Sequence, residues 1–131
     1  MTGETNLQQL LKTMKPKLQP GEYVFCSVAS PGNIDQQQII CVFKEDEGVT
    51  LIVEKSFADK LQLRYSYVAA WITLTVHSSL EATGLTASFA TALAAAGISC
   101  NVVAAFYHDH IFVNKKDAEQ AMQVLTVLSG L

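Results

Sequence analysis

Residues 71–113 read WITLTVHSSLEATGLTASFATALAAAGISCNVVAAFYHDHIFV, and this stretch decides the fold. Its first six residues, 71–76, alternate in polarity and are rich in β-branched side chains, which predicts a strand. Residues 81–84 interrupt that pattern with a glycine. The alanine-rich residues 85–96 then predict a helix that ends at Gly97.

Two more strands follow this helix. Residues 100–106 and 111–113 are apolar and β-branched, and between them lies the polar corner Tyr107-His-Asp-His110. The resulting order of strand, helix, strand and strand is the core of a split βαβ, ferredoxin-like unit.

The first half of the chain predicts a different succession of elements. Leu7, Leu10, Leu11 and Met14 are spaced for one face of a helix that begins at Asn6 and stops before Pro16. A strand is expected after the Pro-Gly turn, then a hairpin whose turn contains Gly48, then a short helix. The expected ranges are 22–29 for the strand, 39–43 and 49–53 for the hairpin, and 54–63 for the helix.

The chain ends in a predicted helix, and its only plausible seam lies near residue 65. Asn114 is a good N-cap, and Ala118, Ala121 and Leu125 fall on one stripe of the helix that follows. No Gly, Pro or charge run marks a linker at the seam. We therefore expect an α+β fold with a mostly antiparallel sheet and helices packed on one face, made of two halves, 1–65 and 66–131, that share the sheet.

Composition excludes several classes of function. The 131 residues are 50% hydrophobic and carry 9 basic and 12 acidic residues, a net charge of -3 without a basic stripe, so nucleic acid is not an expected partner. No apolar run reaches the roughly 20 residues that span a membrane, and the polar N-terminus does not resemble a signal peptide. Cys26, Cys41 and Cys100 lie in apolar runs, which predicts reduced thiols and a cytoplasmic protein.

Few residues have the spacing that chemistry requires. His108 and His110, with His77, form the nearest approach to a metal site, whereas a solvated polar turn explains the same residues more simply. No nucleophile motif and no glycine-rich phosphate or dinucleotide loop is present, so we expect no catalytic residues and no cofactor.

The loop of residues 78–85 has the stronger physical case. Free backbone N–H groups at the start of the next helix attract a carboxylate, Gly84 permits close approach of the backbone, and Glu81 can receive an ammonium group. The loop therefore suits a small zwitterion. The alternative is that Thr83 or Ser79 merely caps the helix and Gly84 is a turn residue.

These residues resemble a known family. Ser79 to Leu85, the Ala96-Gly97-Ile98 passage and the strand from Cys100 to Val103 are similar to the ACT domain, and the whole chain resembles small stand-alone bacterial proteins with two ACT-like halves. The likeness is looser over residues 21–63, where a short loop, Ser30 to Gln38, replaces an expected helix. The second half also lacks an obvious final strand, which either the first half or a partner chain would supply.

The resemblance implies a regulatory or sensing protein, a homodimer without enzymatic activity that binds an amino acid or similar small effector and acts on another protein. The effector-binding residues it implies are Ser79, Leu80, Glu81, Thr83, Gly84 and Leu85. Two alternatives stay open: a protein-interaction module without ligand, and a metal-dependent enzyme using His77, His108 and His110.

Overall fold

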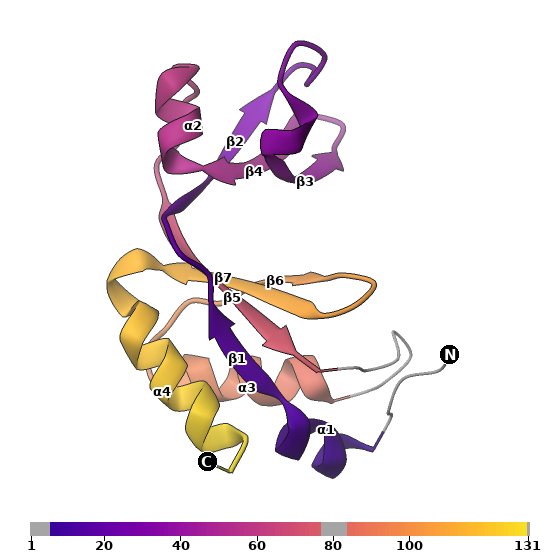
Figure 1. The fold of residues 1–131 in the computed structure, drawn as a ribbon, viewed down its shortest axis with the longest axis vertical. Helices are drawn as coiled ribbons and strands as arrows, with labels where there is room; N and C mark the ends of the chain where they lie inside the picture. Colours follow the sequence, from indigo (N-terminus) through magenta and orange to yellow (C-terminus); the bar gives the residue numbers. More distant parts are fainter. Residues whose placement is uncertain (1–5, 77–83, 131) are drawn as a thin grey trace. The chain divides into compact units, whose positions relative to one another are not determined.

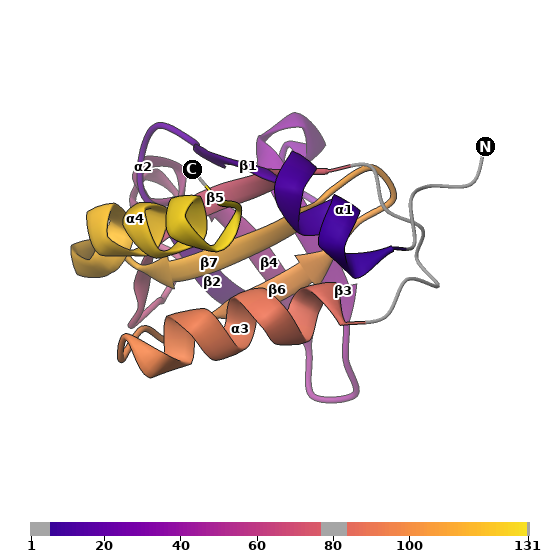
Figure 2. The same ribbon diagram turned by 90° about the horizontal axis from the view of Figure 1, so that it is seen from below.

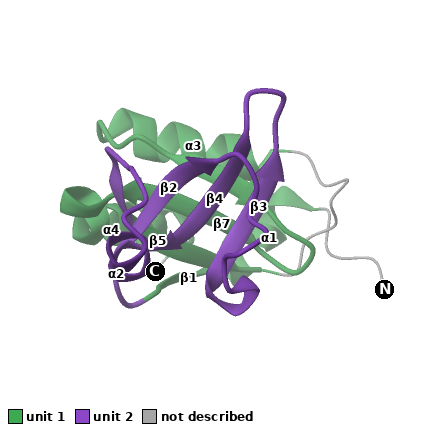
Figure 3. Ribbon diagram, turned by 90° about the horizontal axis from the view of Figure 1, so that it is seen from above, with its two compact units in different colours: residues 1–19, 70–131 green, residues 20–69 purple. Residues whose placement is uncertain are grey.

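The computed structural model of the chain describes residues 6–76 and 84–130. Contacts divide the chain into two compact units, of which unit 1 holds residues 1–19 and 70–131 and unit 2 holds residues 20–69 (Figure 3). The fold is α+β, as predicted (Figure 1). The elements are α1 (Leu7–Thr13), β1 (Lys15–Leu18), β2 (Tyr23–Val28), η1 (Gln36–Gln38), β3 (Ile39–Lys44), β4 (Val49–Glu54), α2 (Lys55–Lys60), β5 (Val68–Thr75), α3 (Leu85–Ala95), β6 (Asn101–Ala104), β7 (Asp109–Asn114), η2 (Lys115–Asp117) and α4 (Ala118–Leu128).

Unit 1 contains the strand, helix, strand, strand core that the sequence predicts. Its strands lie in the order β1, β5, β7, β6, and α3 and α4 lie side by side on one face of them (Figure 2). Alternation on β5 explains this layering, because Ile72 and Leu74 are fully buried beneath the helices while Trp71 and Thr75 alternate with them and stay half-buried. Phe89 and Leu93 of α3 complete the core.

The final strand of unit 1 comes from the N-terminus of the same chain. β1 pairs antiparallel with β5, with Pro16 opposite Leu74 and Leu18 opposite Ile72. Local sequence does not predict a strand here, because Lys-Pro-Lys-Leu contains a proline, which within a sheet is tolerated mainly at an edge. Of the two expected sources for this strand, the first half of the chain supplies it.

The helix α1 joins the same core. The Asn6 side chain accepts a hydrogen bond from the Gln9 amide, which confirms the predicted N-cap. Leu10 and Met14 have no exposed area and pack with the residues of β5, α3 and α4. The N-terminal segment is therefore part of the folded core of unit 1.

Unit 2 is a smaller layer of strands with one α-helix. β4 lies between β3 and β2, and Val24, Cys26, Leu51 and Val53 form its core together with Ala58 of α2. The first residues of β5 take part as well, since Val68 and Ala69 pair with Val24 and Tyr23. β5 thus contributes to the strand pairing of both units. The 3-10 turn η1 lies in the short loop that replaces the helix expected between β2 and β3.

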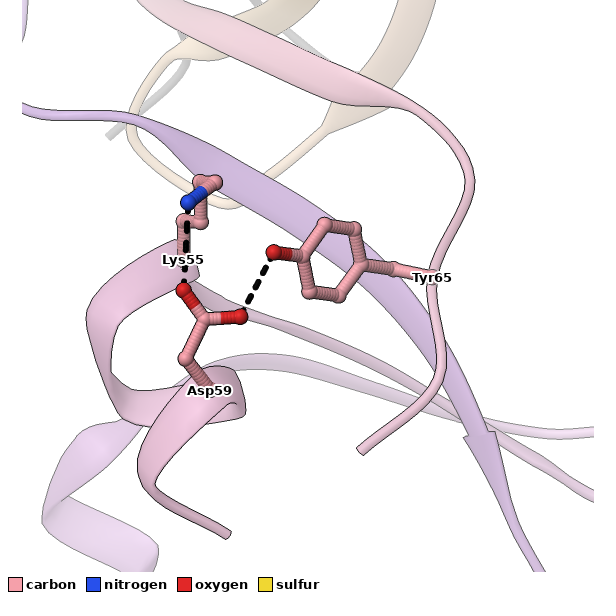
Figure 4. Close-up of polar contacts among 3 residues, drawn as sticks. All are labelled: Lys55, Asp59 and Tyr65. Atoms are coloured by element: carbon pink, nitrogen blue, oxygen red, sulfur yellow. Dashed lines mark hydrogen bonds and ion pairs between the residues drawn. The ribbon is translucent and has the colours of Figure 1, made fainter. Parts of the chain in front are cut away.

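A polar contact ties α2 to the segment that precedes β5. Asp59 accepts hydrogen bonds from the Tyr65 hydroxyl, at 2.6 Å, and from the Lys55 ammonium group, at 3.1 Å (Figure 4). Both bonds favour the ionised carboxylate, so they lower the pKa of Asp59, Tyr65 making the larger contribution. This contact holds the chain where it leaves α2.

The predicted polar corner of unit 1 lies earlier than expected. The turn is closed by a hydrogen bond from the Ala105 amide to the His108 carbonyl, at 3.1 Å, and β7 already begins at Asp109. His110 is consequently a strand residue with a fixed orientation. At the other end of β7 the Asn114 side chain accepts from the Lys116 amide, as predicted for an N-cap, although one 3-10 turn precedes α4.

Candidate functional site

The predicted effector loop ends at the start of α3. Gly84 is the N-cap, in a left-handed conformation with φ 92°. The helix then continues for 11 residues, and its first turn contains no acidic side chain. Gly84 and Leu85 are the predicted binding residues that the structure describes. The others, Ser79, Leu80, Glu81 and Thr83, lie outside the described residues.

The first turn of α3 has the polarity that an anion requires. Within a helix, the first N–H groups have no carbonyl of the preceding turn to bind, and here they belong to Leu85, Thr86 and Ala87. The first helical bond is made by the Ser88 amide to the Gly84 carbonyl, at 2.9 Å. Leu85 is only 3% exposed, so its side chain anchors this end of the helix in the core.

The N-terminal helix closely approaches this position. A Cβ atom at Gly84 would lie 3.2 Å from Cδ2 of Leu7, the first residue of α1. The left-handed backbone therefore favours glycine at residue 84, and a side chain there would also require the Leu7 side chain to move by a few tenths of an ångström. The N-cap residue is Gly84 itself, whereas the alternative assigned the cap to Thr83 or Ser79, and a glycine N-cap is compatible with a binding role.

A hydrogen bond places the β6–β7 turn beside the end of β5. The Nδ1 atom of His108 lies 3.3 Å from the carbonyl oxygen of Val76. Figures 1 and 2 both show this turn at the same end of unit 1 as the last residues of β5 and the first of α3. Phe106 and Tyr107 at the turn are 77% and 69% exposed.

A polar network lies on the face of the strands that points away from the helices, and the sequence pattern does not predict it. The Gln19 amide nitrogen donates to the Thr73 hydroxyl, at 2.9 Å, and the Thr73 oxygen lies 3.0 Å from His110 Nδ1. The Trp71 indole N–H donates to the same nitrogen, at 3.1 Å. Strand alternation puts Trp71 and Thr73 on one face, but nothing local signals their partners.

Two neighbouring residues of β7, Asp109 and His110, have pKa values that are shifted in opposite directions. Burial lowers the pKa of His110, with a smaller contribution from His108 in the same direction. Burial raises the pKa of Asp109, whose residue is 8% exposed. The Trp71 indole can donate only to an unprotonated Nδ1, so the network also favours neutral His110.

The described residues do not place the histidines in a metal site. Over residues 6–76 and 84–130 no group of three His, Cys, Asp or Glu side chains is placed to hold an ion, and His77 lies outside that range. The rings of His108 and His110 are 6.5 Å apart between centroids, and the Nδ1 atoms of both are engaged in the contacts above.

The thiols lack the environment of a nucleophile. Burial raises the pKa of Cys100 to about 11 and also raises that of Cys26. A thiol with so high a pKa is protonated at neutral pH, whereas reactive cysteines need a lowered pKa. The acidic residues 45–47 are exposed at the tip of the β3–β4 hairpin.

Hollows also occur away from the loop. A shallow groove of about 400 Å³ lies between α3 and α4, and its lining carries no charged side chain. Its residues are Ala92, Gln120, Gln123, Val124, Val127 and Leu128.

In the described part of the chain no helix has the length and hydropathy needed to cross a bilayer.

The order of strands and helices is that of a ferredoxin-like α+β protein. Two ACT domain models match the chain, one over residues 2–70 and the other over residues 66–127. The chain therefore belongs to the ACT domain family. No curated protein matches it.

Solved structures show the same fold. The chain is 48% identical to a Vibrio cholerae protein of unknown function, described as a possible transport protein, with 94% of this chain and 95% of that one covered and a TM-score of 0.86. It is 11% identical to the regulatory subunit of aspartate kinase from Thermus thermophilus, with 90% and 98% covered and a TM-score of 0.62. An Agrobacterium tumefaciens protein is 19% identical, with 88% and 89% covered and a TM-score of 0.67.

Proposed function

We propose that this protein is a non-enzymatic sensor that binds an amino acid or a similar zwitterion at the start of α3. The binding residues are Ser79, Leu80, Glu81, Thr83, Gly84 and Leu85. The observation that carries the proposal is the left-handed Gly84 at the head of α3, where the first backbone N–H groups have no acceptor within the helix and can bind a carboxylate. Membership of the ACT family and the likeness to a regulatory subunit support a sensing role.

The proposed roles of the loop residues divide between the two charges of the ligand. The first-turn amides of α3 receive the carboxylate, and Glu81 receives the ammonium group. The shifted pKa values of Cys26 and Cys100 support a role for these thiols in the core and offer no activated nucleophile for catalysis.

The protein acts as a homodimer in this proposal, through α3 and β6. Residues 82–107 contain no Asp, Glu, Lys or Arg. The exposed side chains of α3 are small, as at Ala87, Ala94 and Ala95. β6 is the last strand in its order, and no other strand that the structure describes pairs with its outer edge. An uncharged surface beside a free edge allows two copies to meet without like-charge repulsion.

The two ACT-like halves meet near residue 65 in this proposal. The three free thiols suit the cytoplasm.

Thermal unfolding in the presence of the twenty amino acids, nucleotides and divalent metals tests the sensing role. A ligand at 100 times its dissociation constant adds about 2.7 kcal/mol to the free energy of unfolding. We expect one or a few amino acids to stabilise the protein. A shift with metals alone would support the histidine site instead, and no shift with any amino acid would contradict the proposal.

The zwitterion geometry has its own test with a matched variant. Glu81→Gln should weaken binding of whichever amino acid stabilises the protein in the thermal-unfolding screen. It should not weaken binding of the analogue of that amino acid that lacks the amino group. Glu119→Gln, at an exposed position in the first turn of α4, removes one negative charge elsewhere and should change neither affinity. Equal losses for both ligands would contradict the assigned role of Glu81.

A further inference from the structure

The edge strand β3 of unit 2 is unusually apolar and exposed. It is the first strand in the order β3, β4, β2, so one of its edges is unpaired by any residue of ranges 6–76 and 84–130 (Figure 3). Its residues are Ile-Ile-Cys-Val-Phe-Lys, and none of the six is buried. Val42 is 44% exposed and Phe43 is 66% exposed, and as neighbours on a strand they point to opposite faces.

Exposed apolar edges are normally avoided. Free N–H and C=O groups on such a strand pair readily with another chain, and proteins protect them with charges, bulges or short lengths. β3 has a register shift between Ile39 and Cys41 and a single lysine at its end. The regular and accessible part of the edge is therefore Cys41 to Lys44.

Charge decides against a second copy of this chain at that edge. The hairpin tip next to β3 carries three exposed carboxylates, Glu45, Asp46 and Glu47, and only Lys44 opposes them there. Exposed Asp35 precedes the other end of the strand. Two copies paired in either direction would bring the acidic tip against another tip or against Asp35, and like charges in register are destabilising.

We propose that β3 is the docking edge for an extended segment of a different protein, with apolar side chains on both faces and Lys or Arg at the end that lies beside residues 45–47. Backbone hydrogen bonds along Cys41–Lys44 would add one strand to the layer. Val42 and Phe43 would each contact an apolar side chain on their own face. The three carboxylates set the charge of the partner and the direction in which it binds.

A pair of synthetic peptides tests this inference directly. Both are about ten residues long with only Val and Ile in the centre, so that both faces are apolar, and one has two Lys at each end while the other has two Glu. We expect the basic peptide to bind at least about tenfold more tightly, and its affinity to fall as salt rises. Amide hydrogen exchange should slow in residues 39–44, while β6 provides the internal comparison.

Variants separate the apolar and the electrostatic contributions. Val42→Thr should reduce binding of the basic peptide about tenfold, and Val127→Thr, which alters another exposed valine on α4, should leave it unchanged. Replacing Asp46 and Glu47 by Asn and Gln should cost about two- to fivefold for each charge, and should remove the preference for Lys over Glu ends.

Three outcomes would overturn the proposal. They are equal affinity for the two peptides, protection at β6 in place of β3, and no binding up to millimolar peptide. Self-association that Val42→Thr abolishes would assign the edge to a second copy. Because effector binding at α3 is not required, this result stands or falls separately from the amino-acid screen.

Discussion

Gly84 shows how one residue can be required both by the backbone and by its surroundings. Its φ of 92° and that of Gly97, 76°, lie in the left-handed region that other residues enter at a cost. A Cβ at Gly97 would meet nothing within 4 Å, whereas one at Gly84 would press on Leu7. The two glycines at the ends of α3 thus share a left-handed backbone and differ in the contacts that a Cβ atom would make.

We expect Gly84→Ala to destabilise the protein more than Gly97→Ala. Each substitution should cost about 1–2 kcal/mol for the left-handed backbone, and Gly84→Ala should add the cost of displacing Leu7. Urea denaturation measures both. Combining Gly84→Ala with Leu7→Ala should recover part of the extra loss, and equal effects of the two single changes would show that Leu7 yields freely.

His110 gives the protein a pH dependence of known sign. Its pKa is lowered in the folded state, so as pH falls through the ordinary value near 6.5 the unfolded chain binds a proton that the folded chain does not. The contribution of His110 to stability should therefore decrease from pH 7 toward pH 5, whereas the raised pKa of Asp109 contributes in the opposite direction. His110→Gln should remove this part of the pH dependence, measured as the difference between the two unfolding curves. An unchanged slope would mean that another group carries it.

At the scale of elements, the N-terminal segment is a full part of unit 1. α1 and β1 precede unit 2 in sequence and pack with α3, α4 and β5, which follow it. Such pairing over a long sequence separation is invisible to local patterns, because Lys-Pro-Lys-Leu has neither the alternation nor the β-branched residues of a strand.

Leu10→Ala should therefore destabilise elements far from it in sequence. Leu10 is fully buried, so its truncation should cost about 2–5 kcal/mol and should speed amide exchange in β5 and α4. The neighbouring Leu11 is only partly buried, and Leu11→Ala should cost clearly less. If the two variants behaved alike, the burial of α1 in this core would be wrong.

On the scale of the whole molecule, the compact units have other bounds than the two halves of the sequence, 1–65 and 66–131. ACT domain models match residues 2–70 and 66–127. The compact units are divided differently, because unit 1 includes the N-terminal segment and residues of β5 pair with strands in both units. A fragment of residues 66–131 would leave the β5 edge open where β1 binds and would lack Leu10 and Met14 in the core.

We expect the 66–131 fragment to be unfolded or to aggregate on its own, and to fold when it is expressed together with residues 1–65. Circular dichroism and amide-proton dispersion in NMR spectra measure this, with the intact chain as the reference. A stable monomeric fragment with native dispersion would contradict the requirement for the N-terminal segment.

The sequence by itself determined what depends on near neighbours along the chain. Periodicity located the helices and most strands, and side-chain chemistry located the caps at Asn6, Asn114 and Gly97. It also singled out Gly84 at the head of a helix. These signals are local because each is an energy between residues a few positions apart.

Only the tertiary structure decided which distant residues meet. It paired β1 with β5, set Leu7 against Gly84, and joined Gln19, Thr73, Trp71 and His110 in one network. Gln19 and Thr73 are 54 residues apart. Such contacts depend on how buried faces pack and how strands register, and many pairings are compatible with the same local pattern, so the sequence pattern alone does not select among them.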